Sequence, residues 1–202
     1  MYHISKDKRS IQSSEWIFES LQALSMEMAY EEISITDIVN RAGIGRSTFY
    51  RNFDHKDDVL RFKCNQVCVQ LKDYLINYQT RHGVAPGPAS TKPFLEFWSG
   101  NSYLIETITR INRIDILNNS YIEVLQQYYY NHAYLIEGIP AEYVEYVIAA
   151  NVGSTIGVLV QWIKNKKHES PEDLSKFLLQ HYISSSNRPG SVFKPSEPLI
   201  PR

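Results

Sequence analysis

Hydroxyl, phenol and guanidinium side chains are concentrated in one short segment of this sequence, residues 46–51. In order, the segment holds Arg46, Ser47, Thr48, Phe49, Tyr50 and Arg51. Hydroxyl groups donate hydrogen bonds to phosphate oxygens, and a guanidinium group can bind a phosphate or a guanine edge through two hydrogen bonds. These residue types therefore favour contact with DNA over bond-breaking chemistry. The alternative is that the same side chains form an ordinary solvated helix face.

Two short predicted helices would position this segment. Thr36 would cap the first helix, and Gly43 would end it, because glycine adopts the left-handed conformation at little steric cost. The second helix would run from about Gly45 to Phe53, so that residues 35–53 form a helix-turn-helix. Five apolar side chains would pack this pair against an earlier helix at about residues 10–29: Ile38, Val39, Ala42, Ile44 and Phe49.

The charge of the N-terminal region supports DNA binding only locally. Residues 1–60 hold seven Lys or Arg and ten Asp or Glu, a net charge of −3, whereas residues 41–56 carry a net charge of +3. Lys56 also stands at the start of a predicted helix, beside N–H groups that attract phosphate. A basic charge over the whole domain, the usual mark of a DNA-binding domain, is missing. We therefore expect binding to be focused on one short helix and to need a second copy of the chain.

Helical periodicity dominates the rest of the chain, and no strand-like alternation or internal repeat interrupts it. Helices are predicted at about residues 57–80, 94–111, 114–137, 141–165 and 171–184. With 202 residues, 43% of them hydrophobic, the chain is long and apolar enough for a real core. The predicted fold is therefore all-α, with a first domain over 1–56, a helical bundle over 57–184 and a disordered tail over 185–202.

The helix-turn-helix segment, which reads ITDIVNRAGIGRSTFYRNFDHKDDVL, resembles the signature of TetR-type transcriptional regulators. The resemblance implies three N-terminal helices for DNA binding and a C-terminal helical bundle for ligand binding and dimerisation. Residues 157–178, GVLVQWIKNKKHESPEDLSKFL, are more weakly similar to a regulatory-domain subgroup typical of low-GC Gram-positive bacteria. Carried over by position, the DNA contacts would come from Thr36, Arg46, Ser47, Thr48, Tyr50, His55 and Lys56.

The function that this resemblance implies is that of a cytoplasmic, sequence-specific regulator, a ligand-responsive homodimeric repressor. Its partners would be a palindromic operator in double-stranded DNA, a second copy of the chain and a small-molecule effector. No cofactor, metal or membrane is expected, because no Gly-rich phosphate loop, nucleophile elbow or metal motif occurs. One alternative is a protein–protein interaction module or coregulator without its own operator. Another is a small-ligand-binding protein or an enzyme, although nothing in the sequence suggests a reaction.

Aromatic and small residues in the second half of the chain suggest a pocket and a dimer seam. Phe97, Trp98, Tyr103 and Tyr128 could line a pocket for a planar or amphipathic effector, or could simply be packing residues. Ala149, Gly153 and Gly157 recur every four residues, which would let a second helix approach closely. Trp162 and Phe177 are the expected centres of the dimer seam. The alternative for these two is packing within the chain, between the last two helices.

Two further features have a bland and a sharp reading. Cys64 and Cys68 lie one helical turn apart and could bind a metal or sense oxidants, but buried cysteine is common packing material. The apolar run at residues 146–163 is close to the length that a membrane-spanning helix needs, and a buried helix is the favoured reading. The N-terminus lacks the apolar stretch of a signal peptide, and the low cysteine content fits a reducing compartment.

Overall fold

The computed structural model describes residues 1–5, 7–84 and 87–186. Its α-helices are α1 (Lys8–Glu27), α2 (Ile35–Ala42), α3 (Arg46–Asn52), α4 (Lys56–His82), α5 (Thr91–Gly100), α6 (Ser102–Arg110), α7 (Ile114–Asn131), α8 (Ala141–Lys164) and α9 (Pro171–Ser186). Within the described ranges, the only β contact is an isolated bridge between Tyr2 and Phe53. The predicted all-α fold is confirmed. Residues 187–202, most of the predicted tail, lie outside the described residues.

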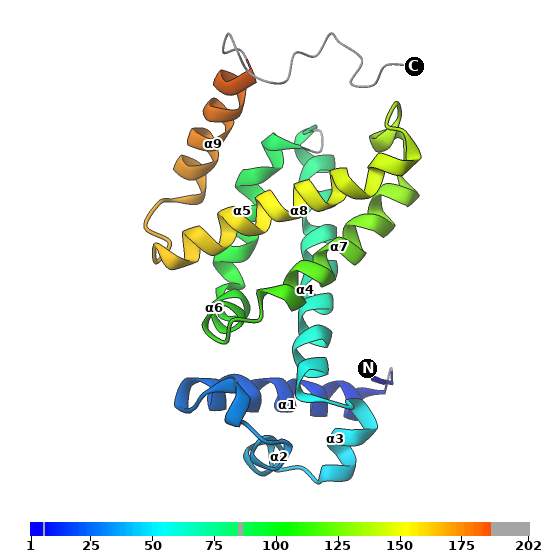
Figure 1. The fold of residues 1–202 in the computed structure, drawn as a ribbon, viewed down its shortest axis with the longest axis vertical. Coiled ribbons are helices and arrows are strands. Elements are labelled where there is room, and N and C mark those ends of the chain that lie inside the picture. Colours follow the sequence, from blue (N-terminus) through cyan, green and yellow to red (C-terminus); the bar gives the residue numbers. More distant parts are fainter. Residues whose placement is uncertain (6, 85–86, 187–202) are drawn as a thin grey trace.

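The helices form two groups that are joined by α4 (Figure 1). Helices α1, α2 and α3 make the N-terminal bundle at the lower end of the view, and α5 to α9 make the C-terminal bundle above it. Helix α4 rises out of the N-terminal bundle, packs against α1 and then runs along α5 and α7. Any change in the tilt of α4 therefore moves both groups.

One continuous hydrophobic core runs from α1 to α8. Helix α4 supplies its middle section, since Val59, Leu60, Cys64, Val67, Cys68 and Leu71 are all buried. Burial of apolar side chains contributes about 25 cal/mol per Å² of surface removed from water, so this row is a main source of stability. The two bundles are consequently fused through α4 rather than linked by a flexible tether.

Helix α2 has a well-defined start and end, but its cap differs from the prediction. Ser34 is the N-cap, and its hydroxyl accepts a hydrogen bond from the Asp37 amide at 3.2 Å while Asp37 accepts one from the Ser34 amide at 2.9 Å. This reciprocal capping box outcompetes Thr36, which lies inside the first turn and is exposed. Gly43 ends the helix with φ of +64°, as predicted.

The helix predicted over residues 94–111 is in fact two helices. Helix α5 ends at Gly100, and the Asn101 side chain donates a hydrogen bond to the Phe97 carbonyl at 2.9 Å. Glycine weakens a helix and asparagine competes for backbone hydrogen bonds, so the pair ends α5. Similarly, the helix expected over 114–137 ends at Asn131 and is followed by a 3₁₀ turn at Ala133–Ile136.

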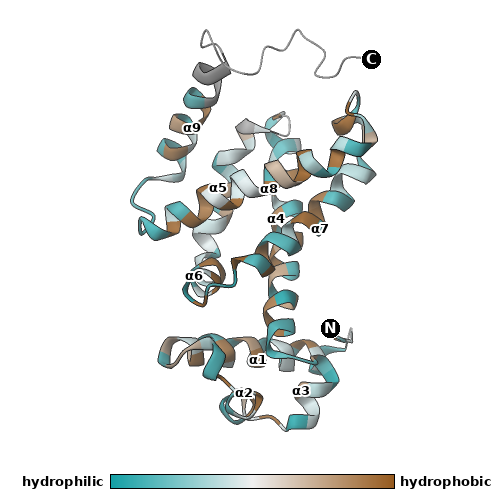
Figure 2. Cartoon of the chain, viewed as in Figure 1, coloured by the Kyte–Doolittle hydropathy of each residue, from teal (hydrophilic) through white to brown (hydrophobic). Residues whose placement is uncertain are grey.

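Helix α8 is apolar but only half covered. Its inner row, which includes Ile148, Val152 and Leu159, is buried, whereas Tyr146 on the outer side is 74% exposed. Figure 2 shows the hydrophobic residues along this helix. By length and composition alone, α8 could cross a membrane, and no other helix in the described ranges passes the same test. The fully buried helix that the sequence favoured is therefore wrong in one respect, because the outer apolar face is open.

Candidate nucleic-acid interface

Helix α3 is fastened to α1 by a buried side-chain clamp. Asn52, at the end of α3, is completely buried and accepts a hydrogen bond from the Ser10 hydroxyl at 2.7 Å. Its amide group donates to the Ser13 hydroxyl at 3.0 Å and to the Thr48 carbonyl at 3.2 Å. Buried polar groups need such partners, so the clamp fixes the position of α3 on α1.

The inner side of α3 is apolar and the outer side is polar. Phe49, and Phe53 directly after the helix, have no exposed surface, and their rings lie 5.8 Å apart in the core. Because consecutive residues point in different directions around a helix, burial of Phe49 turns the opposite face outward. The exposed residues of this helix are Arg46, Ser47, Tyr50 and Arg51, whereas Thr48 is half-buried.

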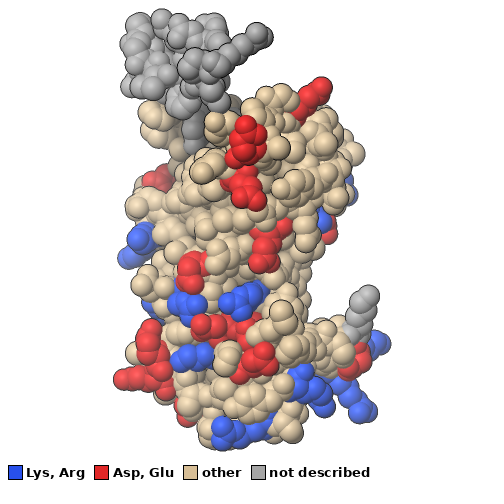
Figure 3. All heavy atoms as spheres, turned by 45° about the vertical axis from the view of Figure 1, so that its right-hand side comes forward, with Lys and Arg blue, Asp and Glu red and all other residues tan. Residues whose placement is uncertain are grey.

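The positive charge available on this face comes from two arginines. Among the described residues, neither Arg46 nor Arg51 makes an ion pair, whereas Arg41 binds Glu27 at 2.8 Å. The hydrogen bond from Arg41 holds the pKa of Glu27 below its usual range. Figure 3 shows Lys and Arg side chains at the lower end of the molecule, with acidic residues among them. The local positive charge predicted for residues 41–56 is thus concentrated on α3.

The other predicted DNA contacts lie at the ends of α2 and α4, and they differ in how free they are. Thr36 and His55 are exposed. The Lys56 ammonium donates hydrogen bonds to three backbone carbonyls, those of Tyr30, Glu31 and Ile33, and lies 4.5 Å from the centre of the Tyr30 ring. Lys56 therefore ties α4 to the turn before α2, and its contact with phosphate stays a prediction.

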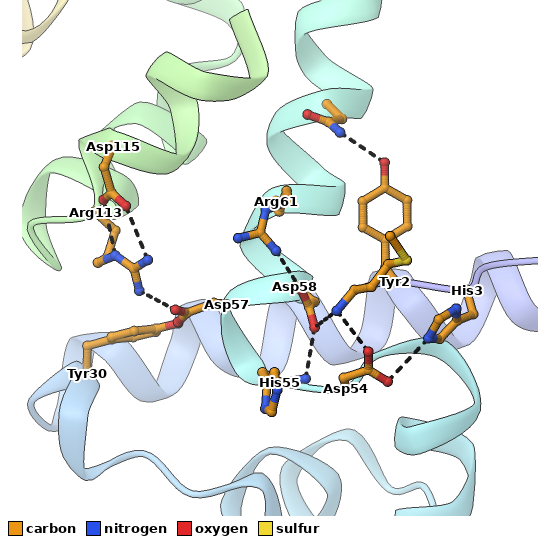
Figure 4. A network of polar contacts seen from close by, with 12 residues as sticks. Tyr2, His3, Tyr30, Asp54, His55, Asp57, Asp58, Arg61, Arg113 and Asp115 are labelled. Carbon is orange, nitrogen blue, oxygen red and sulfur yellow. Dashed lines mark hydrogen bonds and ion pairs between the residues drawn. The ribbon is translucent and has the colours of Figure 1, made fainter. Parts of the chain in front are cut away.

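An ionic link joins the N-terminal bundle to the loop before α7 (Figure 4). Asp57, in the first turn of α4, binds Arg113 at 2.7 Å and accepts a hydrogen bond from the Tyr30 hydroxyl at 2.6 Å. Arg113 also pairs with Asp115 at 3.1 Å. Burial opposes ionisation of Asp57, yet the hydrogen bonds from Arg113 and Tyr30 hold its pKa below the usual range. The link positions the base of α4 from both bundles.

A cavity of about 340 Å³ lies between α4, α5, α7 and α8. Of the four predicted pocket residues, only Tyr128 lines it. Trp98 is buried in the core, Phe97 packs against Tyr74, and Tyr103 packs edge-on against Phe18 of α1. Those three aromatic residues face other helices because α5 and α6 are separate, so the prediction that they line the cavity is not met.

The residues predicted for a dimer seam also divide into two groups. Gly153 and Gly157 are exposed on α8, and a Cβ atom at either position would meet nothing within 4 Å. Phe177 on α9 is 64% exposed. Trp162 is 2% exposed, and its indole N–H donates to the Glu169 carbonyl at 2.9 Å, so it packs within the chain. The first three residues therefore lie on the open apolar surface, and Trp162 does not.

The two cysteines are packing residues in this structure. Cys64 and Cys68 have no exposed surface, and burial raises the pKa of Cys64 to about 12. Burial raises the pKa of Cys68 as well. The thiolate is the reactive form of cysteine, so these environments disfavour it. No cluster of three or more His, Cys, Asp or Glu suited to a metal occurs among the described residues.

The sequence analysis missed the two contacts that position α3 and α4, the Asn52 clamp and the Arg113–Asp57 link. For Asn52 a signal was present, because serines at 10, 13, 14, 20 and 25 recur at helical spacing beside the apolar residues of α1. Such serines on a buried face require a polar partner. For Arg113 and Asp57 the sequence carried no comparable signal, because their pairing depends on where α7 begins.

Comparison with known proteins gives a consistent result. The model for bacterial regulatory proteins of the tetR family matches residues 22–61, and a model for a transcriptional regulator C-terminal region, TetR_C_8, matches residues 89–183. The uncharacterized HTH-type transcriptional regulator YxbF of Bacillus subtilis (strain 168) is 23% identical over 184 residues, or 86% of this chain. The chain spans only 45% of the length of that relative.

Two solved structures are similar in fold. Lin0861 from Listeria innocua has a TM-score of 0.72 at 14% identity, with 90% of this chain and 95% of that one covered. A protein from Syntrophomonas wolfei str. Goettingen, described as a TetR-family transcriptional regulator, has a TM-score of 0.65 at 20% identity, with coverage of 86% and 94%. At these identities the structures establish the fold alone. Together, the two family models and the helix-turn-helix geometry establish that this chain belongs to the TetR family of transcriptional regulators.

Proposed function

We propose that this regulator is a homodimeric repressor that binds a palindromic operator and releases it when a small molecule binds. The observation that carries the proposal is the outer face of α3, where Arg46, Ser47, Tyr50 and Arg51 are exposed while Phe49 anchors the opposite side. In helix-turn-helix proteins the second helix enters the major groove with its N-terminal residues at the base edges. Arg46 and Ser47 would therefore read bases.

The remaining contacts would position the protein on the DNA backbone. Tyr50 and Arg51 follow one turn later on α3 and would bind phosphates, with Thr48 beside them. Thr36 and His55 are exposed at the neighbouring helix starts and would bind phosphates too. A contact from Lys56 requires its ammonium to give up one of its carbonyl partners. Contacts of this kind supply affinity without reading sequence.

The open face of α8, together with α9, would pair with the same face of a second copy. The exposed Gly153 and Gly157 let two helices approach closely, and Phe177 supplies an exposed aromatic anchor. Such pairing would form a four-helix bundle about a twofold axis. It would place the two α3 helices in successive major grooves, about 34 Å apart.

The cavity would hold the effector, and α7 would carry the signal to the DNA-binding end. Helix α7 lines the cavity with Tyr121 and Tyr128 and begins beside Arg113, which binds Asp57. An effector shifts the equilibrium only if it binds the conformer unable to bind DNA more tightly. On this proposal residues 1–56 bind DNA, residues 57–184 bind the effector and the second copy, and the protein works in the cytoplasm.

The direct test is fluorescence anisotropy of the full chain with a labelled palindrome from its own promoter. We expect affinity to fall steeply with salt, because phosphate contacts release counterions. Arg46→Ala should weaken specific binding about tenfold or more, relax sequence preference and lower the salt slope by about two for a dimer. A folded dimer that fails to bind the palindrome at low salt would contradict the proposal.

A matched control comes from the other end of α4. Arg81 is exposed like Arg46 but lies at the C-terminal end of that helix, in the C-terminal bundle. Arg81→Ala removes the same charge and should leave affinity and salt slope unchanged. An equal loss in both variants would mean that general charge, not the α3 face, drives binding.

A second candidate function is that of a coregulator that acts through a partner protein. The net charge of −3 over residues 1–60 favours it, since a DNA-binding domain is usually basic. The double variant Arg46→Ala, Tyr50→Phe separates the two functions. A DNA reader should lose operator binding and repression while it stays dimeric, whereas a coregulator should keep both its partner and its effect on transcription.

A further inference from the structure

The cavity between α4, α5, α7 and α8 has a definite chemical character. Its volume of about 340 Å³ is at the small end of the range for drug-sized ligand sites, roughly 300–1,000 Å³. Four aromatic residues from two helices line it: Phe94, Tyr121, Tyr128 and Tyr129. Aromatic side chains bury large apolar areas and favour offset or edge-on contact with other rings. A small ligand with an aromatic ring system therefore fits these walls.

Tyr121 offers a hydrogen bond that nothing in the described part of the chain takes up. Its side chain is 7% exposed and lines the cavity, and its hydroxyl makes no hydrogen bond to any described residue. Burial raises the pKa of this phenol, so the hydroxyl keeps its proton and can donate it. A buried tyrosine hydroxyl normally has a partner. The cavity thus presents a donor for an acceptor atom on a ligand.

The charges around the cavity discriminate between ligand classes. Lys72 is the only charged residue that lines it, and no Asp or Glu does. The ammonium of Lys72 otherwise pairs with its exposed neighbour Asp73 at 3.3 Å. Transfer of an ion from water into an apolar site is costly without a counter-ion. An organic cation would find none here, whereas an anion would find the ammonium of Lys72.

We infer that this cavity binds an aromatic monoanion, such as an aryl carboxylate or sulfonate, and rejects organic cations. The rings would pack among Phe94 and the tyrosines, and the acid group would accept hydrogen bonds from Lys72 or Tyr121. That such a ligand controls DNA binding rests on the proposed function. Binding itself does not, since it depends only on the cavity.

The test measures binding to the full chain by isothermal titration calorimetry with three aromatic probes. The anion is 1-anilinonaphthalene-8-sulfonate, the uncharged probe is N-phenyl-1-naphthylamine, which has the same rings without the sulfonate, and the cation is thioflavin T. We expect one anion per chain, bound at least tenfold more tightly than the uncharged analogue, which is about 1.4 kcal/mol. Thioflavin T should not bind.

Substitutions then assign the site. Lys72→Gln should lower the affinity of the anion about tenfold and leave the uncharged analogue unchanged, because only the charge is lost. Thr155→Trp should fill part of the cavity and weaken both probes. Lys164→Gln, at an exposed lysine of α8 that does not line the cavity, is the matched control and should change nothing. Circular dichroism checks that each variant is folded.

Each result decides the question. Tighter binding of thioflavin T, or anion binding that ignores both Lys72→Gln and Thr155→Trp, overturns the inference. Failure of all three probes to bind the folded protein overturns it too. If the anion fails while operator binding persists, the inference falls and the proposed function stands. If the anion binds as expected while the palindrome does not, the reverse holds.

Discussion

The N-terminal and C-terminal bundles satisfy their polar groups in different ways. In the N-terminal bundle Asn52, Ser10 and Ser13 pair inside the core, and Ser34 and Asp37 cap α2 from both sides. In the C-terminal bundle the buried Trp98 indole and Ser120 hydroxyl have no partner among the described residues. The comparison indicates that one end holds a fixed surface, whereas the other retains the space and unmet hydrogen bonds that a ligand can use.

The largest predicted effect would break the fixed end. Asn52→Leu keeps a similar volume but removes every hydrogen bond of the clamp, so the Ser10 and Ser13 hydroxyls lose a buried partner. We expect the free energy of unfolding to fall by about 3 kcal/mol, and operator binding to be lost even where the protein is folded. Urea unfolding and anisotropy measure both. Asn77→Leu, at an exposed asparagine of α4, should be within about 0.5 kcal/mol of wild type.

If Asn52→Leu left both stability and operator binding intact, the contrast between the two bundles would be lost. In that case the orientation of α3 would depend on Phe49 and Phe53 alone. The same urea experiment would then show equal tolerance to polar loss in both bundles.

A second prediction sharpens the contrast at the open face of α8. Gly153→Leu puts a side chain into space that is empty within one chain but would lie in the dimer seam. The dimer dissociation constant should rise at least tenfold, about 1.4 kcal/mol, by analytical ultracentrifugation. Monomer stability should rise slightly, because glycine is a poor helix former. Gly100→Leu, also in open space, is the control, and an unchanged dimer would place the seam elsewhere.

The smallest predicted effect concerns the link between the bundles. Asp57→Asn removes the charge that holds Arg113, and should cost about 0.5–1 kcal/mol at neutral pH, since solvent screens a pair that is partly exposed. The pKa of Asp57 is lowered on folding, so its contribution is present above about pH 4 and is lost as the pH falls through the lowered value. The acid limb of the stability profile should therefore be flatter in Asp57→Asn.

Glu19→Gln is the control for the pH profile. Glu19 is exposed, and it makes no ion pair with a described residue. Chemical unfolding at a series of pH values measures both variants. A profile for Asp57→Asn that matches wild type would mean that the link adds no stability, and that the bundles are joined by apolar packing alone.

The extent of prediction from sequence followed from how local each feature was. The helix-turn-helix, Gly43 as its turn residue and the Ser170–Asp173 cap were predictable, because each depends on residues within one or two turns. Thr36 was wrongly chosen as the cap, because Ser34 offers the same chemistry two residues earlier with a better-placed Asp37. The break at Gly100 was missed because apolar periodicity continues across it.

Features that depend on distant contacts were less accessible. Phe97, Trp98 and Tyr103 have the composition of a pocket, but which aromatic residue faces a cavity depends on how five helices pack. Trp162 resembled an interface anchor, yet the carbonyl of Glu169 captures its indole N–H within the chain. Composition predicted that tyrosines would line a pocket, and tertiary packing determined which ones.

The continuous core has a consequence for exchanging parts between relatives. A cut at residue 56 follows the boundary expected from sequence, but α1 packs on α4 and Lys63 of α4 binds Glu15 of α1 at 2.7 Å. A chimera joined there would set foreign side chains from α4 against the native α1. The portable unit that could be grafted between regulators thus extends through Leu71, the last fully buried residue of α4.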